Sequence, residues 1–197
     1  MKQHGRKNSV LLLHGIDDTS DRMAHLGDYL ALRGWTTGSV DMTPNDGSHS
    51  LEMLARVVAD RAETQFPAGR PFDLVCFSMG SIVGRYYLQR LGGHARVQRF
   101  VTIAGPHNGT LTAFFRHNPG SRELRPGSIL LNDLNQDVNL LAQLQVTTIW
   151  TPFDLMIFPA WSSRLPFGQE VLVPVPIHPW MLHDRRVFSA VEKALEK

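Results

Sequence analysis

Short apolar runs alternate with segments of helical periodicity along most of this chain, and that alternation constrains the fold more than any other feature. The runs at 9–13, 72–77 and 97–104 carry bulky apolar residues at odd and even positions, which is typical of strands covered on both faces. Segments with apolar residues at helical spacing follow them and end at glycines. The pattern predicts an α/β fold, with a mostly parallel sheet and helices on both faces.

The expected elements follow one another from end to end. Strands are expected at 9–13, 36–41, 72–77, 97–104, 146–151 and 171–175. Helices are expected at about 23–33, from a cap at Ser48 or Ser50 to about residue 62, at about 79–91 and at 184–197. Residues 105–145 break the rhythm, because they are rich in Asn, Pro and Gly. We expect a loop-rich excursion there, near the mouth of a pocket.

Length and charge limit the class of protein further. The chain has 197 residues, 43% of them hydrophobic, which is enough for one domain over 1–197 with its own core. Charged residues make up only 19%, too few for a disordered chain. Lys and Arg number 20 against 18 Asp and Glu, so no large basic surplus favours binding to nucleic acid.

Cysteine usage and the first apolar run bear on compartment and cofactors. Cys76 is the single cysteine, so no internal disulfide can form, and no Cys/His cluster has the spacing of zinc ligands. The run at 10–13 is shorter than a signal-peptide core and far shorter than a membrane span. We therefore expect a soluble cytoplasmic protein with no metal and no organic cofactor.

Ser78 is the candidate nucleophile. It stands between the strand at 72–77 and the helix that follows, where a sharp turn would lift its hydroxyl above the sheet edge. Such a turn needs small residues on both sides, and Gly80 and Cys76 stand two residues away. A serine that merely caps the helix is the alternative interpretation. Backbone N–H groups of Ile16, after the first strand, and of Met79 are candidate donors to an oxyanion.

A serine nucleophile needs a base and a carboxylate that orients it, in the order Ser, Asp, His for this type of fold. Asp154 and His178 each follow a predicted strand by three residues, so both fall at the loop mouths where open α/β sheets bind ligands. The alternatives are His183 as base and Asp133 or Asp137 as the acid. Asp41 precedes the serine and has the wrong order.

Several motifs together resemble the α/β-hydrolases. They are VLLLHGI at 10–16, FSMGSIVGRYYL at 77–88, VTIAGPHNGT at 101–110, RPGSILLNDLN at 125–135, DLMIFP at 154–159 and IHPWMLHDRRVFSAV at 177–191. More narrowly, the chain resembles small, lidless serine lipases and esterases related to the GPI inositol-deacylase-like group. The resemblance implies a minimal α/β-hydrolase fold in which Ser78, Asp154 and His178 are catalytic and Ile16 and Met79 form the oxyanion hole. Cys76, Phe77 and Ser81 depart from the usual Gly, His and Gly.

The resulting hypothesis is a serine hydrolase that cleaves carboxylic esters through an acyl-enzyme. Candidate residues for binding an apolar acyl group are Phe77, Leu111, Phe114, Met156 and Ile157. The substrate would be a small-molecule or lipid ester, which is compatible with peripheral contact with a membrane. Two alternatives remain at this point: an acyltransferase with the same triad, and a binding protein that keeps the fold without turnover.

Overall fold

A single parallel sheet organises the molecule, and the computed structural model describes residues 7–197 of the chain. The sheet has six strands in the order β2-β1-β3-β4-β5-β6, and every neighbouring pair is parallel. The predicted α/β-hydrolase fold is confirmed. The strands are β1 (Ser9–Leu13), β2 (Thr37–Val40), β3 (Phe72–Phe77), β4 (Val97–Ile103), β5 (Gln145–Trp150) and β6 (Gln169–Leu172).

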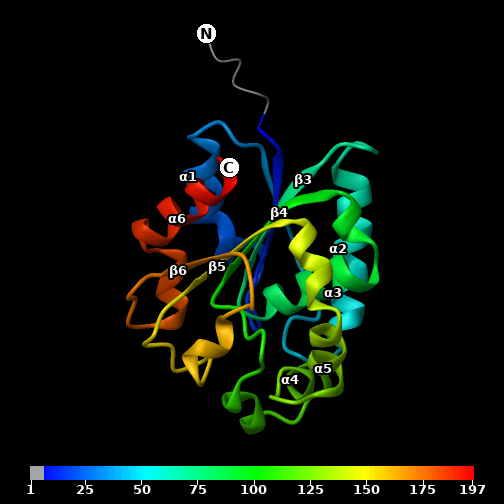
Figure 1. Cartoon of the computed structure of the whole chain (residues 1–197), viewed down its shortest axis with the longest axis vertical. Helices are drawn as coiled ribbons and strands as arrows, with labels where there is room; N and C mark the ends of the chain where they lie inside the picture. Colours follow the sequence, from blue (N-terminus) through cyan, green and yellow to red (C-terminus); the bar gives the residue numbers. More distant parts are fainter. Residues whose placement is uncertain (1–6) are drawn as a thin grey trace.

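Helices cover both faces of the sheet, α1 and α6 on one side and α2 and α3 on the other (Figure 1). The α-helices are α1 (Ala24–Ala31), α2 (Leu51–Gln65), α3 (Met79–Arg90), α4 (Pro119–Glu123), α5 (Ile129–Gln136) and α6 (Arg185–Leu195). Short 3₁₀ helices are η1 (Ser20–Met23), η2 (Gly93–Ala95), η3 (Leu111–Phe115), η4 (Val138–Gln143), η5 (Ala160–Ser163) and η6 (His178–Leu182). Ser50, the second of the two predicted caps, accepts a hydrogen bond from Met53 N–H at the start of α2.

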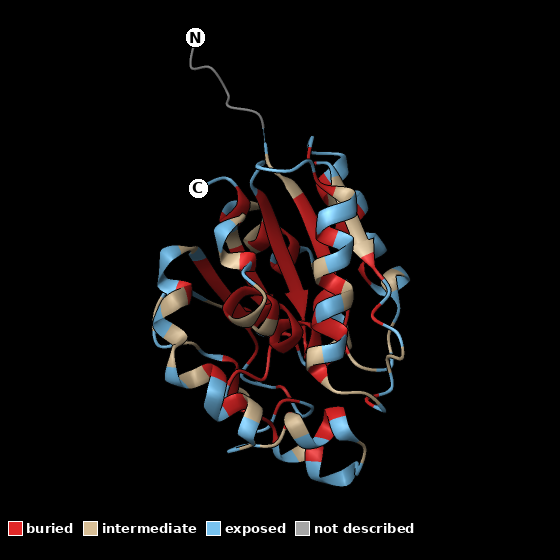
Figure 2. Ribbon diagram, turned by 90° about the vertical axis from the view of Figure 1, so that its right-hand side faces the viewer, coloured by how far each residue is buried: buried red, intermediate tan, exposed pale blue. Residues whose placement is uncertain are grey.

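The core consists of two apolar layers separated by the sheet. Along β1, Leu11 and Leu13 pack into the layer beneath α2 and α3, whereas Val10 and Leu12 pack into the layer beneath α1 and α6. Successive side chains of a strand point to opposite faces, so a strand apolar at every position is buried on both. Figure 2 shows the central strands buried and the outer helix surfaces exposed.

The order of the strands places a crevice above β1 and β3. The chain passes from β1 to β2 on one side, and β3 then pairs with the opposite edge of β1, with Leu13 beside Cys76. Open α/β sheets bind ligands where the strand order reverses in this way, at the carboxyl ends of the strands. This edge lies at the lower side of Figure 1, with α4 and α5 close to it. Ser78 follows β3 at this edge.

Two segments differ from the sequence prediction. The last strand is Gln169–Leu172 rather than 171–175, so His178 begins η6 six residues beyond the strand. The segment 105–145 contains α4 and α5 in addition to loop, and Asn118 and Ser128 cap these two helices with their side chains. Among residues 7–197, none of the helices combines the length and the apolar character needed to cross a membrane.

Candidate active site

Ser78 occupies a sharp turn between β3 and α3. Its backbone has φ 51° and ψ −124°, a conformation that is costly for a residue with a Cβ. The turn is held from one side by a 2.9 Å hydrogen bond from Ser78 N–H to the carbonyl of Ile103. From the other side it is closely packed, because a Cβ at Gly80 would lie 2.4 Å from the carbonyl oxygen of His14. Glycine is therefore required at position 80.

His178 and Asp154 form a buried hydrogen-bonded pair. The imidazole Nδ1 of His178 lies 2.6 Å from Oδ2 of Asp154, and each residue is 3% exposed. The other carboxylate oxygen accepts hydrogen bonds from the N–H groups of Met156 and Ile157, at 2.9 and 2.8 Å. Asp154 is thus fixed by its own loop and in turn fixes the imidazole.

Thr151 connects the loop that carries Asp154 to the loop that carries His178. Its hydroxyl donates to the carbonyl of Val175 at 2.7 Å and accepts from Val175 N–H at 3.1 Å. This side chain replaces strand pairing beyond the end of β6, which stops at Leu172. The loop before His178 is thereby held at the end of β5.

The second ring nitrogen of His178 has no hydrogen-bond partner among residues 7–197. A carboxylate only accepts, so Nδ1 carries the proton and Nε2 presents a lone pair. That Nε2 is buried, and no atom of residues 7–197 forms a hydrogen bond with it. The ring packs on Phe77, the residue before Ser78, with 4.8 Å between centroids. A buried, unpaired nitrogen therefore belongs to a ring that contacts the residue next to the strained serine.

Two backbone N–H groups flank Ser78. Met79 is the first residue of α3, so its N–H has no partner within the helix. Ile16 lies in the loop after β1, where its neighbour Gly15 approaches the serine so closely that a Cβ there would be 3.2 Å from Ser78 Cβ. Ile16, Ser78 and Met79 line the same cavity. Both N–H groups thus belong to residues that line the cavity at Ser78.

The cavity at Ser78 has a volume of about 190 Å³ and is mostly apolar. Of the acyl-binding candidates, Met156 and Ile157 line it, whereas Phe77, Leu111 and Phe114 do not. Phe77 is buried against His178, and Leu111 and Phe114 are about half exposed. Lining residues that the sequence did not single out include Thr110, Thr112, Ala113, Arg116, Leu124 and Leu155.

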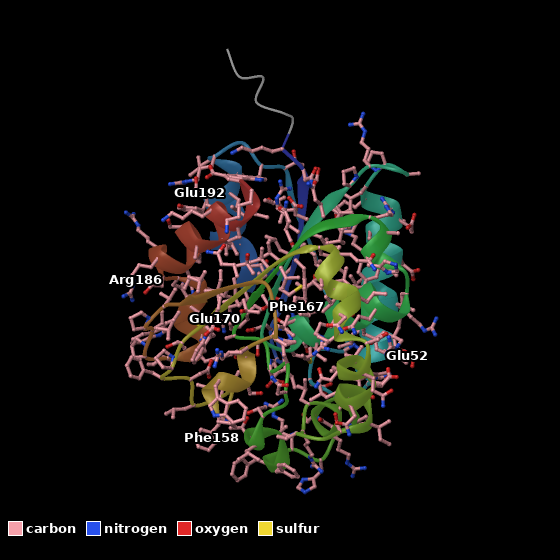
Figure 3. All side chains as sticks on the ribbon, in the orientation of Figure 1. Glu52, Phe158, Phe167, Glu170, Arg186 and Glu192 are labelled. Carbon is pink, nitrogen blue, oxygen red and sulfur yellow. The ribbon has the colours of Figure 1, made fainter. Side chains whose placement is uncertain are left out.

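The loop after β5 and the segment after β4 are joined beside this cavity. Thr110 Oγ1 donates to the carbonyl of Met156 at 2.8 Å and accepts from Phe158 N–H at 2.9 Å. Leu111 N–H donates to the carbonyl of Phe158 at 2.8 Å. In Figure 3 the side chain of Phe158 lies at the lower edge of the molecule, beside these segments. One wall of the cavity is therefore built by both segments together.

Comparison with known proteins identifies the family. The family model described as palmitoyl protein thioesterase matches residues 9–153. The chain belongs to the palmitoyl protein thioesterase family. The lysosomal thioesterase PPT2 of Mus musculus and that of Rattus norvegicus are each 29% identical over 109 residues, which cover 53% of this chain and 36% of the relative. The match thus spans only about a third of the length of these curated relatives.

Solved structures of low sequence identity share the fold. Bacillus licheniformis lipase BlEst2 in its mature form superposes with a TM-score of 0.80 at 16% identity, covering 97% of this chain and 93% of the lipase. Aspergillus fumigatus lipase B superposes with a TM-score of 0.81 at 14% identity, covering 98% of this chain and 53% of that protein. The predicted resemblance to α/β-hydrolase lipases and esterases is confirmed. The chain has the α/β-hydrolase fold.

The residues considered as alternative acids and bases form contacts with other partners. His183 is exposed and its ring packs edge-on against His25, with 5.0 Å between centroids. Asp133 and Asp137 both form ion pairs with Arg90 of α3. Asp41 accepts a hydrogen bond from Ser20 N–H at 2.6 Å, which holds the pKa of that carboxyl below its usual range.

Several buried polar groups pack around α3. Arg85 is fully buried and donates to the carbonyls of His107 and Leu134, and burial lowers the pKa of its guanidinium to about 10. Burial and the neighbouring Arg85 also lower the pKa of His107. The Cys76 thiol lies against the backbone of Gly84, and burial raises its pKa. The bond from Arg85 to His107 attaches the segment after β4 to α3, and the contact of Cys76 with Gly84 packs β3 against the same helix.

Proposed function

We propose that this chain is a serine hydrolase that cleaves acyl esters, with Ser78 as nucleophile, His178 as general base and Asp154 as the carboxylate that orients it. The observation that carries the proposal is the buried His178, bound to Asp154 through Nδ1 at 2.6 Å and unpaired at Nε2. An unpaired buried nitrogen is destabilising, so its presence in the folded protein calls for an explanation. A role as base for Ser78 supplies one, because the ring packs on Phe77, which directly precedes the strained serine.

The proposed reaction proceeds in two steps. Ser78 Oγ attacks the carbonyl carbon while its proton passes to Nε2 of His178, and the bond to the leaving thiol or alcohol then breaks as His178 returns the proton to it. Water next attacks the acyl-enzyme, again losing a proton to His178. The carboxylic acid is released and Ser78 regains its proton.

Charge that develops on the carbonyl oxygen would be stabilised by the N–H groups of Ile16 and Met79. Met79 N–H lies at the N-terminus of α3, where the helix dipole also favours a negative charge. Donors of this kind act without reorganisation because the backbone holds them before the substrate binds. The proposed oxyanion hole therefore needs no movement of a loop.

An apolar acyl group is the proposed substrate moiety. The cavity next to Ser78 is lined by Met156, Ile157 and Leu124 among other apolar groups, which suits an aliphatic chain. Membership of a thioesterase family favours an acyl thioester. Carboxylic oxygen esters pass through the same acyl-enzyme, and we expect them to be hydrolysed as well.

Matched substrates and matched variants test the proposal. A thioester and a p-nitrophenyl ester of the same acyl group should both be hydrolysed, and Ser78→Ala and His178→Ala should each lower turnover by on the order of 10⁴, with the double variant little worse. The exposed Ser48→Ala and His183→Ala serve as controls and should retain wild-type rates. Near-normal activity of His178→Ala together with loss in His183→Ala would overturn the assignment of the base.

Two other functions for the same fold can be separated by simple measurements. An acyltransferase would give new esters when a competing alcohol is added, whereas the proposed hydrolase should yield mainly free acid. A binding protein without turnover would fail to react with a fluorophosphonate, which labels an activated serine. We expect labelling at Ser78 and none in Ser78→Ala.

A further inference from the structure

His14 is a fully buried polar residue directly after β1, and the triad does not use it. Its ring makes a hydrogen bond at each nitrogen. Nδ1 lies 2.8 Å from the carbonyl oxygen of Gly15, and Nε2 lies 2.9 Å from the backbone nitrogen of Met42. The ring therefore joins the end of β2 to the loop that passes Ser78.

The two partners determine which nitrogen of His14 carries the proton. A backbone N–H can only donate, so the bond with Met42 requires a lone pair on Nε2. A carbonyl oxygen can only accept, so the bond with Gly15 requires a proton on Nδ1. The ring is thus neutral, and its Nδ1–H donates to the carbonyl of Gly15.

The carbonyl of Gly15 and the N–H of Ile16 belong to one peptide unit. That unit is trans, since the cis peptide bonds of residues 7–197 are at Thr43-Pro44 and Phe158-Pro159. In a planar trans peptide the C=O and N–H bonds point in opposite directions. A hydrogen bond that holds the carbonyl of Gly15 therefore also sets the direction of Ile16 N–H, and it polarises that N–H as a donor.

The surroundings favour an N–H that is aimed at the cavity. Within residues 7–197, Ile16 N–H donates to no backbone or side-chain acceptor, and Ile16 lines the cavity with Ser78. Met42, at the other end of the ring, is fully buried. A hydrogen bond also fixes the backbone of the next residue of the loop, because Asp17 N–H donates to the carbonyl of Asn45 at 2.8 Å.

From this geometry we infer that His14 is a positioning residue for the oxyanion hole: it holds the Gly15–Ile16 peptide so that Ile16 N–H faces the carbonyl oxygen attacked by Ser78. The inference rests on the proposed function, because it assigns a direction to one of the two proposed donors.

Two substitutions test the two hydrogen bonds of the His14 ring one at a time. In His14→Asn the amide nitrogen can take the place of Nδ1 and keep the bond to Gly15, while the bond to Met42 is lost. In His14→Gln the amide oxygen can reach the place of Nε2 and keep the bond to Met42, while the bond to Gly15 is lost. Each variant should be measured for melting temperature, thioester kinetics, inhibition by a trifluoromethyl ketone and the rate of fluorophosphonate labelling at Ser78.

We expect labelling of His14→Asn within about threefold of wild type and labelling of His14→Gln slower by tenfold to about a hundredfold, somewhat less than the loss of a whole oxyanion donor. In His14→Gln, kcat and ketone affinity should fall together while KM changes by less than about twofold, since the donor acts mainly in the transition state. Wild-type labelling in His14→Gln would overturn the inference. Equal losses of labelling rate in His14→Asn and His14→Gln, in proportion to their losses of melting temperature, would also overturn it.

Wild-type protein provides a test that does not depend on the folding of a variant. Nuclear magnetic resonance of ¹⁵N-histidine-labelled protein reports the tautomer of His14, and we expect the proton on Nδ1. A proton on Nε2 would overturn the inference. If wild type is labelled at Ser78 but hydrolyses neither ester, the proposed function fails while the labelling ratio still decides on His14. A wild type that is not labelled at Ser78 overturns both.

Discussion

Removing the Cβ of Ser78 should make the protein more stable while abolishing its activity. The backbone at Ser78 has φ 51° and ψ −124°, which a glycine adopts at little cost and an alanine does not. Ser78→Gly and Ser78→Ala both lose the hydroxyl group. The difference between these two variants therefore measures the strain that the Cβ carries.

The size of this difference follows from two opposing contributions. Release of backbone strain stabilises the folded state by roughly 1–3 kcal/mol, whereas the greater freedom of glycine in the unfolded chain costs about 0.4–1 kcal/mol. At the midpoints of these ranges, the free energy of unfolding of Ser78→Gly should thus exceed that of Ser78→Ala by about 1.3 kcal/mol. For a domain of this length that corresponds to a melting temperature about 3–5 °C higher.

Differential scanning calorimetry and urea titration of both variants measure the difference. Ser39, in the middle of strand β2, provides a matched control, because Ser39→Gly should be less stable than Ser39→Ala by about 0.5–1 kcal/mol. A Ser78→Gly variant no more stable than Ser78→Ala would refute the reasoning. It would mean that the turn at Ser78 stores no strain in solution.

Three further predictions concern buried groups near the site. Cys76→Ala should retain turnover within about tenfold, and thiol reagents should not inactivate the wild type, because burial raises the pKa of this thiol and keeps it protonated. Arg85→Leu removes the side-chain donor to the carbonyl of His107 and one of the two side-chain donors to the carbonyl of Leu134, so urea titration should show a loss of about 1–3 kcal/mol in the free energy of unfolding; a loss below about 0.5 kcal/mol would contradict this. Burial holds the pKa of His107 well below 6.5, so the unfolded chain binds the additional proton and stability should decrease as pH falls below about 6.5, by up to about 1.4 kcal/mol per pH unit. The loss between about pH 7.5 and about pH 5.5 should be smaller in His107→Gln, and an unchanged loss would assign it to other groups.

The central strands could be predicted from the sequence because burial on both faces makes them continuously apolar. β1 and β3 have the predicted bounds. The bounds of the last strand could not be predicted, because β6 is an edge strand whose residues are mostly exposed. The apolar Val173 and Val175 that suggested its position are buried just beyond its end.

The positions of the predicted site residues could be inferred from the sequence to different extents. Ser78, Asp154 and His178 follow strands that end at one edge of the sheet, so chain order alone brings them near one another. The cavity wall depends on the orientation of η3, which the sequence did not predict. Leu111 and Phe114 are three residues apart and share a face of this 3₁₀ helix, and that face is largely exposed.

Trapping the acyl-enzyme tests the central claim most directly. The wild type should be mixed with a thioester, quenched within milliseconds and analysed by intact-mass and peptide mass spectrometry, with Ser78→Ala and the exposed Ser48→Ala in parallel. We predict that the wild type and Ser48→Ala gain the mass of one acyl group, located on Ser78, and that Ser78→Ala gains none. Hydrolysis of the thioester by Ser78→Ala at the wild-type rate, or an acyl group located on another residue, would contradict the account.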